Sequence, residues 1–373
     1  MRNKIKVVFC INDFLVGGAQ RMLAGLLSRL DRERFEPILV TLFYWEGKDY
    51  FYDLVPGDVP VHRLNFRGFW DIQSWFRLYA LMRILDPDIL LSNLFFSNTV
   101  IRVLGTLFRF KVFIVEHNTY IKKTKFHQRI DKVLSRVTEK IVAVSNTVAE
   151  FTSAQENIPR EKFVVIHNGI DIEALRAECD RYDRMAVKKE FGIAENTRVI
   201  LSVARLTTQK NPLLLLEGFA LFSKMRPLYA LVIVGGSPKW ELLLGTRAKE
   251  LGVAHRVFLF GTRKDVARFY AIADIFVSTS TIEGFGIAHA EALACGVPVL
   301  STKTAGPDEM IKEGENGFFI SESTPEAVAE GLEKMISADL ETMRGRAKES
   351  IGKYGIDQAT VAYANLFSDQ KSL

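Results

Sequence analysis

The chain has 373 residues, of which 48% are hydrophobic and 25% are charged, and its formal net charge is +5. This is the composition of a globular protein, so it excludes a chain that is mainly disordered. At roughly 100–200 residues per domain, the length predicts two or three domains.

Apolar runs and cysteines define the expected cellular setting. No run reaches about eighteen apolar residues, so we expect no transmembrane helix. The apolar run at residues 7–11 is too short for a signal peptide and is predicted to be a first β-strand. Cys10, Cys179 and Cys295 are widely spaced and odd in number, which argues against a disulfide framework and favours a reducing cytosol.

Positive charge is concentrated in the first half of the chain. Residues 1–170 hold 24 Lys and Arg against 17 Asp and Glu, whereas the remaining residues hold 25 against 27. Most of the excess lies in residues 102–140, and aromatic residues are frequent in the same half. Two interpretations stay open: a solvated helical face, or a surface for anionic lipid headgroups or a phosphorylated acceptor. The residues that we assign to such a surface are Lys122, Lys123, Lys125 and Arg129. We expect no nucleic-acid partner, because no nucleic-acid motif appears.

In the first half, short apolar runs alternate with amphipathic stretches. The predicted strands are 4–11, 35–43, 59–64, 88–92, 112–116, 140–144 and 163–166. The predicted helices are 19–30, 72–85, 99–108, 126–136 and one that begins at 147.

The second half repeats this alternation. The predicted strands are 198–204, 230–235, 257–261, 275–278, 298–301 and 317–320. The predicted helices are 212–224, 239–251, 266–271, 287–294, 307–312 and others from 325 onward. Such alternation predicts parallel sheets with right-handed crossovers. We therefore expect an α/β protein with two Rossmann-like doubly wound domains, at 1–170 and 171–356, that face a ligand-binding cleft.

One segment combines two glycines with two glutamates where a strand gives way to a helix. It reads Glu283-Gly284-Phe285-Gly286-Ile287-Ala288-His289-Ala290-Glu291. Backbone N–H groups at the positive end of a helix bind phosphate. Carboxylates accept hydrogen bonds from sugar hydroxyls. A helix cap with one structural glutamate is the plain alternative, and the spacing and the accompanying motifs favour a ligand site.

Two cations follow the strand predicted at 198–204. Arg205 and Lys210 lie in the loop after this strand, and a pair of cations there suits a diphosphate. Without a metal, they would neutralise a nucleoside-diphosphate leaving group. A merely basic loop would explain either cation alone, but it does not explain Arg205 and Lys210 together with the other motifs.

Over its whole length the chain resembles glycosyltransferase family 4, the retaining enzymes with the two-domain GT-B fold. The resemblance rests on the order and spacing of several motifs: Gly17-Gly18-Ala19-Gln20-Arg21, Glu116-His117-Asn118, Val144-Ser145, His167-Asn168-Gly169-Ile170-Asp171, Arg205 with Lys210, Val234-Gly235-Gly236, Glu283–Glu291 and Ala305-Gly306-Pro307 before Glu309.

The resemblance implies roles for the second domain, which would bind the nucleotide-sugar donor. Arg205 and Lys210 would bind the diphosphate, Glu291 the ribose hydroxyls and Glu283 the donor sugar. Backbone N–H groups of Phe285, Gly286 and Ile287 would face phosphate and sugar, and the base would stack near Thr262 and Arg263.

The first domain would bind the acceptor. The resemblance implies that His117 faces the donor sugar, although a lone histidine is more often a satisfied core residue. Gly17 and Gly18 are assigned to donor binding: they would present N–H groups to the donor diphosphate or to an acceptor phosphate, or form only a tight turn. The last helix, within 357–373, would pack back on this domain.

No metal or other cofactor is expected. Asp86-Pro87-Asp88 has the Asp-x-Asp spacing of metal-dependent transferases, but the proline lies between a predicted helix end and a strand start, where it ends the helix. We therefore assign no metal ligand.

The expected reaction is transfer of a hexose or N-acetylhexosamine, with retention, from a UDP-sugar, or from GDP-mannose as second choice. The start of the chain is similar to that of bacterial enzymes that extend lipid-linked or lipopolysaccharide glycans. The resemblance thus implies a polysaccharide-assembly enzyme in the cytoplasm, peripherally bound to the inner face of the membrane. A GT-B sugar-nucleotide epimerase and a non-catalytic nucleotide-sugar-binding module remain the alternatives.

Overall fold

The computed structural model describes residues 4–46, 50–108 and 110–369, and it divides into two compact units. One unit contains the residues up to 169 together with those from 356 on, and the other contains Ile170–Gly355. Residues 370–373, which the expected last helix included, lie outside the described part of the chain.

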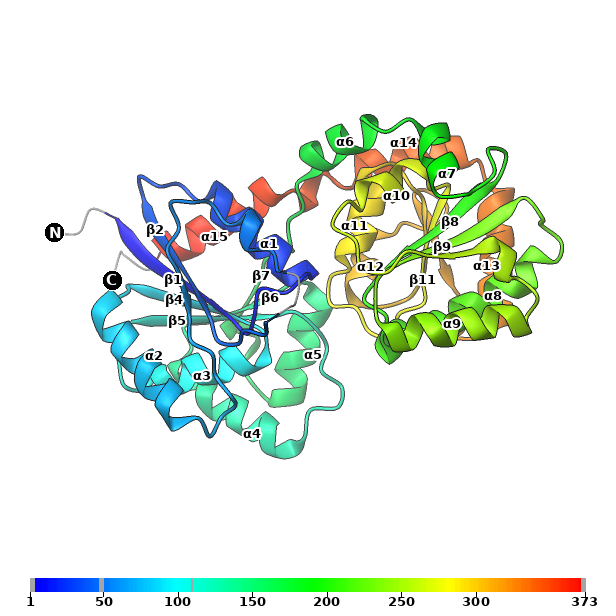
Figure 1. Cartoon of the computed structure of the whole chain (residues 1–373). Coiled ribbons are helices and arrows are strands. Elements are labelled where there is room, and N and C mark those ends of the chain that lie inside the picture. Colours follow the sequence, from blue (N-terminus) through cyan, green and yellow to red (C-terminus); the bar gives the residue numbers. More distant parts are fainter. Residues whose placement is uncertain (1–3, 47–49, 109, 370–373) are drawn as a thin grey trace. The chain divides into compact units, whose positions relative to one another are not determined.

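The first unit is built on a seven-stranded parallel sheet, in the order β3-β2-β1-β4-β5-β6-β7. Its strands are β1 (Ile5–Ile11), β2 (Phe35–Thr41), β3 (Val61–Arg63), β4 (Ile89–Asn93), β5 (Lys111–Glu116), β6 (Lys140–Ala143) and β7 (Phe163–Val165). Its main helices are α1 (Gly18–Arg29), α2 (Ile72–Leu85), α3 (Phe95–Gly105), α4 (Lys125–Leu134), α5 (Asn146–Glu156) and α15 (Ile356–Ser368). Helices α1 and α15 cover one face of the sheet and α2 to α5 the other (Figure 1).

The second unit has a six-stranded parallel sheet in the order β10-β9-β8-β11-β12-β13. Its strands are β8 (Arg198–Val203), β9 (Tyr229–Val234), β10 (Val257–Leu259), β11 (Ile275–Ser278), β12 (Val299–Thr302) and β13 (Gly317–Ile320). Its main helices are α6 (Ile172–Asp180), α7 (Arg184–Glu190), α8 (Pro212–Ser223), α9 (Pro238–Glu250), α10 (Ala267–Ile272), α11 (Ile287–Ala294), α12 (Ala305–Met310), α13 (Pro325–Ser337) and α14 (Leu340–Ser350). The expected class of two doubly wound α/β sheets is confirmed.

The two sheets reverse their winding direction at equivalent places. In the first unit β1 lies beside β4, and in the second β8 lies beside β11. Open parallel sheets bind ligands beyond the carboxyl ends of such neighbouring strands. The loops that follow these four strands are therefore where a site is sought.

Helix α15 completes the core of the first unit. The ring of Phe367 lies edge-on to those of Phe9, Phe35 and Phe113, with centroids 6.0–6.1 Å apart. Phe367 and Tyr363 are fully buried. The last helix therefore belongs to the apolar core on which β1, β2 and β5 pack.

Helix α3 begins at Phe95, whereas the sequence predicted a start at 99. The residue before it, Leu94, has φ +75° and ψ +154°, which is rare for a side chain with a Cβ. Ser97 explains part of this turn, because its N–H donates to Asn12 Oδ1 (2.8 Å) and its hydroxyl bonds back to the Asn93 carbonyl. The end of β1 is thereby joined to the start of α3.

The thiols of Cys179 and Cys295 meet in the second unit, with their Sγ atoms 2.9 Å apart. They come from α6 and from the residue after α11, 116 positions apart in the sequence. Spacing along the chain gave no sign of this contact.

Candidate functional site

Two loops of the second unit are joined by hydrogen bonds beyond the ends of β8 and β11. The N–H of Thr281 donates to the Gln209 carbonyl (2.8 Å), and Gln209 Nε2 donates to the Ile282 carbonyl (2.8 Å). The hydroxyl of Thr279 donates to the Asn211 carbonyl (2.9 Å). These bonds hold the loop with Lys210 against the loop with Glu283 at the place where the strand order reverses.

Lys210 and Glu283 form an ion pair between these loops. Their side chains are 18% and 13% exposed, and Ser280 Oγ donates to Glu283 Oε1 (2.9 Å). Burial would raise the pKa of Glu283, but Lys210, His289 and the two hydrogen bonds together hold that pKa below its ordinary value. Arg205 is exposed at the end of β8. The sequence predicted a site with Lys210 and Glu283, and the structure brings these two side chains into contact.

The loop after Glu283 leads into the N-terminus of α11. Gly286 precedes the helix with φ +86° and ψ +64°, in the left-handed region that favours glycine. Among the residues that the structure describes, no side chain caps this helix end. A helix N-terminus is a positive end of the backbone, so this loop is suited to an anion next to Lys210.

Gly306 supports the same loop from α12. A Cβ on Gly306 would lie 2.0 Å from the carbonyl oxygen of Phe285 and 2.3 Å from its Cα. Phe285 is 2% exposed, and its ring packs edge-on against that of Tyr354 with the centroids 5.5 Å apart. Because Gly306 has no side chain, α12 packs directly against the backbone of Phe285 and holds the loop at 283–286 in place.

The variant Gly306→Ala is expected to lose about 1–3 kcal/mol of unfolding free energy, since the backbone of Phe285 must move. Urea unfolding measures this loss. Gly245→Ala is the matched control, because a Cβ there meets nothing within 4 Å and Gly245 lies inside α9. Equal stability of the two variants would contradict the close packing.

Glu291, expected to hold ribose hydroxyls, lies one turn into α11. Its side chain is buried with the residue 6% exposed, and Tyr270 donates its hydroxyl to Glu291 Oε2 (2.9 Å). The sequence gave no sign of this partner, because Tyr270 lies in α10 at an apolar position. His289 lies two residues before Glu291 on the same helix and is 1% exposed. Its Nε2 is 3.0 Å from Ser301 Oγ, and burial lowers the pKa of His289 to about 4.

Thr262 and Arg263, expected near the base, follow β10. Arg263 makes two hydrogen bonds to Asp265 (2.6 and 2.7 Å), which raise its pKa. A Cβ on Gly236 would lie 2.4 Å from Thr262 Oγ1, so the loops after β9 and β10 are in close contact. Both residues thus lie on the carboxyl edge that also holds Arg205 and Lys210.

In the first unit, Gly17 and Gly18 form the start of α1 after β1. Gly17 is extended (φ −174°, ψ +163°), and no side chain caps this helix within the described residues. The adjoining turn is held by Asp13, whose Oδ1 accepts from the Leu15 N–H and from Gln20 Nε2 (both 3.1 Å). The glycines therefore lie at the carboxyl edge of the first sheet, as predicted for a turn, and nothing more is assigned to them by geometry.

His117 follows β5 at the same edge. Its Nε2 lies 3.0 Å from Oδ1 of Asn93, the last residue of β4, and burial lowers the pKa of His117 to about 4. A neutral imidazole at neutral pH hydrogen-bonds without contributing charge. Asn93 was missed by sequence analysis, although its place at the end of a buried strand was a usable signal.

Lys123 is not part of a membrane or acceptor surface, and that prediction is wrong. Its side chain is 4% exposed, with Nζ 2.7 Å from Asp131 Oδ2 and an ion pair to Glu156. Arg102 pairs with Asp131 in the same buried cluster. Buried cations require such partners, so the charge of Lys123 is used inside the unit rather than on its surface.

The other three residues assigned to that surface, Lys122, Lys125 and Arg129, are exposed. They lie on or just before α4. Among the described residues, no helix is long and apolar enough to cross a membrane.

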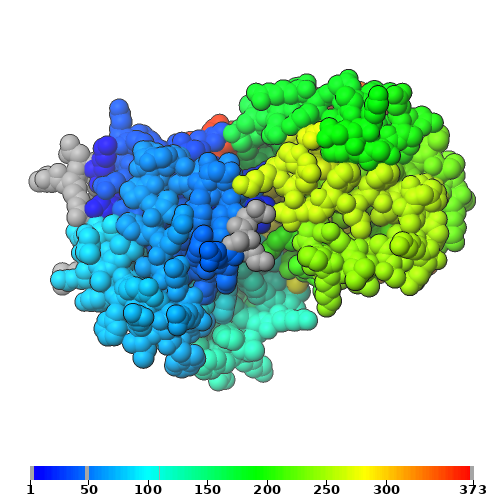
Figure 2. All heavy atoms as spheres, in the orientation of Figure 1, coloured from blue at the N-terminus to red at the C-terminus, as the bar shows by residue number. Residues whose placement is uncertain are grey.

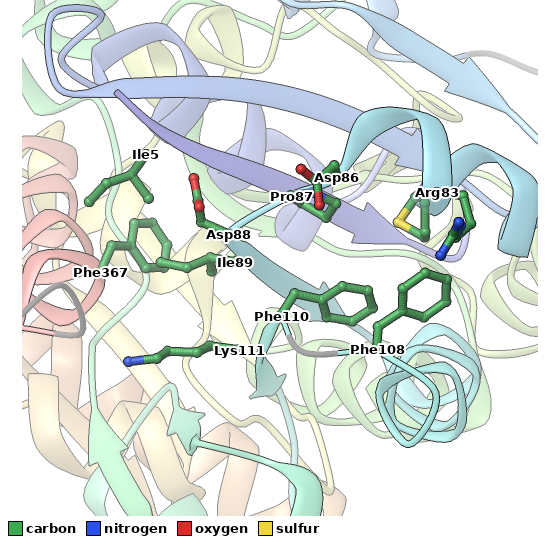
Figure 3. Close-up of a pocket in the computed structure, with 11 residues that line it drawn as sticks. Ile5, Arg83, Asp86, Pro87, Asp88, Ile89, Phe108, Phe110, Lys111 and Phe367 are labelled. Carbon is green, nitrogen blue, oxygen red and sulfur yellow. The ribbon is translucent and has the colours of Figure 1, made fainter. Parts of the chain in front are cut away.

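A cavity of about 620 Å³ lies at the opposite, amino edge of the first sheet (Figure 3). It is lined by Asp86 and Asp88 of the Asp-Pro-Asp motif, with Arg83 and Lys111 nearby. Asp86 ends α2 in a left-handed conformation, and Asp88 Oδ2 accepts the N–H of Lys6 (2.7 Å). Three or more potential metal ligands gather nowhere in the described part of the chain. The two aspartates lie at the junction of α2 with β4.

The fold and the loops at its strand ends define a class: proteins with two doubly wound α/β units, a fold that binds ligands beyond the carboxyl ends of its parallel strands. The family model of the glycosyltransferases of family 4 matches residues 16–174, and that of the glycosyl transferases group 1 matches residues 183–356. Together the two models account for most of both units, and the chain belongs to this family of glycosyltransferases.

Two curated relatives agree with this assignment. An uncharacterized glycosyltransferase of Methanocaldococcus jannaschii is 28% identical over 53% of this chain, and the match spans about half of that protein. The UDP-Gal:α-D-GlcNAc-diphosphoundecaprenol α-1,3-galactosyltransferase of Escherichia coli is 25% identical over 85% of this chain and 84% of its own length.

Solved structures share the fold over the full length. The Anabaena protein Alr3699/HepE in complex with UDP and glucose has a TM-score of 0.83 at 21% identity, covering 98% of this chain and 99% of its own. WaaG, a glycosyltransferase involved in lipopolysaccharide biosynthesis, has a TM-score of 0.77 at 18% identity, covering 97% and 99%.

Proposed function

We propose that this chain transfers a hexose or N-acetylhexosamine, with retention, from a UDP-sugar to a hydroxyl of a lipid-linked glycan. GDP-mannose is the second choice of donor. The observation that supports the proposal most is the joined pair of loops with Lys210 and Glu283 beside the N-terminus of α11. A cation and a positive helix end suit a diphosphate, and a carboxylate next to them suits sugar hydroxyls.

The second unit would hold the donor. Lys210, Arg205 and the N-terminus of α11 would neutralise the departing diphosphate without a metal, which is electrostatic stabilisation of the transition state. Glu291 would accept hydrogen bonds from the ribose. The Anabaena structures with UDP and with UDP-glucose support a uridine nucleotide.

The first unit would hold the acceptor, with neutral His117 near the donor sugar. We assign no carboxylate as a nucleophile for a double displacement. Attack by the acceptor hydroxyl on the same face, with a phosphate oxygen of the leaving group taking its proton, therefore fits retention better. The galactosyltransferase of Escherichia coli, which is named for UDP-Gal and α-D-GlcNAc-diphosphoundecaprenol, supports a lipid-linked acceptor. Such an acceptor would bring the enzyme to the inner face of the membrane, where exposed Lys122, Lys125 and Arg129 would meet anionic headgroups.

A thermal-shift comparison of UDP, GDP, ADP and TDP, without added metal, tests the donor assignment. UDP at a hundredfold excess over its Kd is expected to add about 2.7 kcal/mol of stability, while ADP and TDP serve as matched controls. An increase in thermal stability with GDP alone would contradict a UDP-sugar donor and favour GDP-mannose. A folded protein that responds to none of the four would contradict the donor assignment.

A further inference from the structure

The outer surface of α2 is unusually apolar. On a helix at the surface of a protein, the outward positions are normally polar. Here the exposed apolar side chains on this helix and beside it are Trp70 (95% exposed), Ile72 (69%), Phe76 (71%), Tyr79 (41%), Ile84 (79%) and Leu107 (67%). In Figure 2 the light-blue and cyan spheres of this part of the chain form much of the visible surface of the first unit.

Helix α2 has a buried face and a separate exposed apolar face. Ser74, Leu78 and Met82, spaced four residues apart, are buried against the first unit. Ile72 and Phe76 are also four apart, but they lie two positions away from the buried row and so point to the opposite side. The exposed row is therefore not an extension of the core, and it remains in contact with water unless a partner covers it.

The cations within this helix favour an anionic partner. Asp71 caps the start of α2 by accepting from Ser74, and Asp86 follows its end, but neither α2 (Ile72–Leu85) nor α3 (Phe95–Gly105) itself contains an aspartate or glutamate. Arg77 and Arg83 are exposed on α2. Exposed Trp, Phe and Tyr beside arginines are the composition of surfaces that rest in the headgroup region of a bilayer.

Aromatic rings connect this surface to the carboxyl edge of the first sheet. Phe66 lies edge-on to Trp75 of α2 and to Phe96 of α3, both with centroids 6.0 Å apart, and Phe69 contacts Phe96 at 4.2 Å. Phe96 lies at the start of α3, three residues after Asn93, which contacts His117. A lipid-bound face at α2 would thus belong to the same unit as the carboxyl edge of the first sheet, which is expected to receive the acceptor. Packed aromatic rings connect the two.

We propose that the α2 face, defined by Trp70, Ile72, Phe76, Arg77 and Arg83, inserts into the headgroup region of an anionic lipid bilayer. This inference rests on the proposed function for its biological sense, since it names the surface that would bring the enzyme to a lipid-linked acceptor. The proposed surface differs from the one expected from the basic run at residues 102–140. Here membrane binding comes mainly from burying apolar area on α2, rather than from the lysines near α4.

Cosedimentation of the full chain with vesicles tests the proposal. Vesicles of phosphatidylcholine with phosphatidylglycerol are expected to bind the protein, and pure phosphatidylcholine vesicles to bind it more weakly. Trp70→Ser/Phe76→Ser is expected to lower the partition coefficient about tenfold or more, because both side chains would otherwise leave water. Leu242→Ser, on α9 of the second unit with Leu242 74% exposed, is the matched control and is expected to bind like the wild type.

Three outcomes would overturn the proposal. They are absence of binding to either vesicle, unchanged binding of the double variant, and an equal loss in the Leu242 variant. A concentration-dependent dimer that disappears in the double variant would assign the face to a second copy of the chain instead. The stabilisation by UDP is expected to be the same in the wild type and the double variant, so failure here is distinguishable from failure of the donor assignment.

Discussion

Replacement of Lys210 by alanine is expected to lower kcat by about 10²–10³-fold, while the Kd for UDP changes much less. Lys210 is held beside Glu283 in the loop after β8, where the proposed function places the departing diphosphate. In other enzymes, removing one preorganised group that stabilises developing charge lowers kcat by about 10²–10³-fold. Release of UDP from the UDP-sugar that stabilises the protein most is the measurement.

Two further variants separate charge from structure. Lys210→Arg retains the positive charge and is expected to recover part of the lost kcat. Lys224→Ala removes an exposed lysine at the end of α8 and is expected to leave turnover unchanged. Wild-type turnover in Lys210→Ala would refute the role of Lys210 as a catalytic residue.

Replacement of Lys123 by methionine is expected to destabilise the protein by about 3–5 kcal/mol. Burial alone would lower the pKa of Lys123, but Glu116, Glu156 and Asp131 together raise it, so the side chain stays charged. Without Lys123, buried carboxylates lose their cation, and removing one partner of a buried pair has a cost of this size. Lys122→Met, at the exposed neighbouring position, is the matched control and is expected to change stability by less than about 0.5 kcal/mol.

The loss in Lys123→Met is expected to depend on pH. Burial and Glu116 raise the pKa of Glu156 to about 7, outweighing Lys123, so the folded state binds this proton more tightly than the unfolded chain does. A raised folded pKa adds stability below the unfolded value, and that stability is lost as the pH rises through about 7. Urea unfolding is therefore expected to show a smaller loss at acidic pH, where carboxylates can protonate, than at alkaline pH. A loss that is the same at both would argue that Lys123 acts by packing alone.

The sequence was sufficient for features that depend on local pattern. Alternating apolar runs and helical stretches predicted both parallel sheets, and Gly286 with Glu283 identified the loop before α11. The fate of Lys123 was not readable in the same way. Its partners lie 8 and 33 residues further along, on α4 and α5, and only the packing of these helices decides which lysine of a basic run turns inward.

Partners across the sheet were hidden for the same reason. Tyr270 reaches Glu291 from α10, and Asn93 reaches His117 from the neighbouring strand. Helical periodicity located α2 correctly, but it did not distinguish a helix buried on both sides from one with an exposed apolar row. That distinction depends on how many neighbouring elements surround the helix, which is a property of the tertiary structure.

The position of α15 has a consequence for how the chain folds during synthesis. The second unit is continuous, from Ile170 to Gly355, so all of its strands and helices have been synthesised before α15 appears. The first unit, although its sheet is made first, lacks Tyr363 and Phe367 until the ribosome has passed them. Domains usually fold in order from the N-terminus. Here the second unit can be completed before the first, because the first unit still lacks α15. The nascent first unit would wait with the apolar surface around Phe9 and Phe35 uncovered, and a chaperone that shields that surface would act before α15 does.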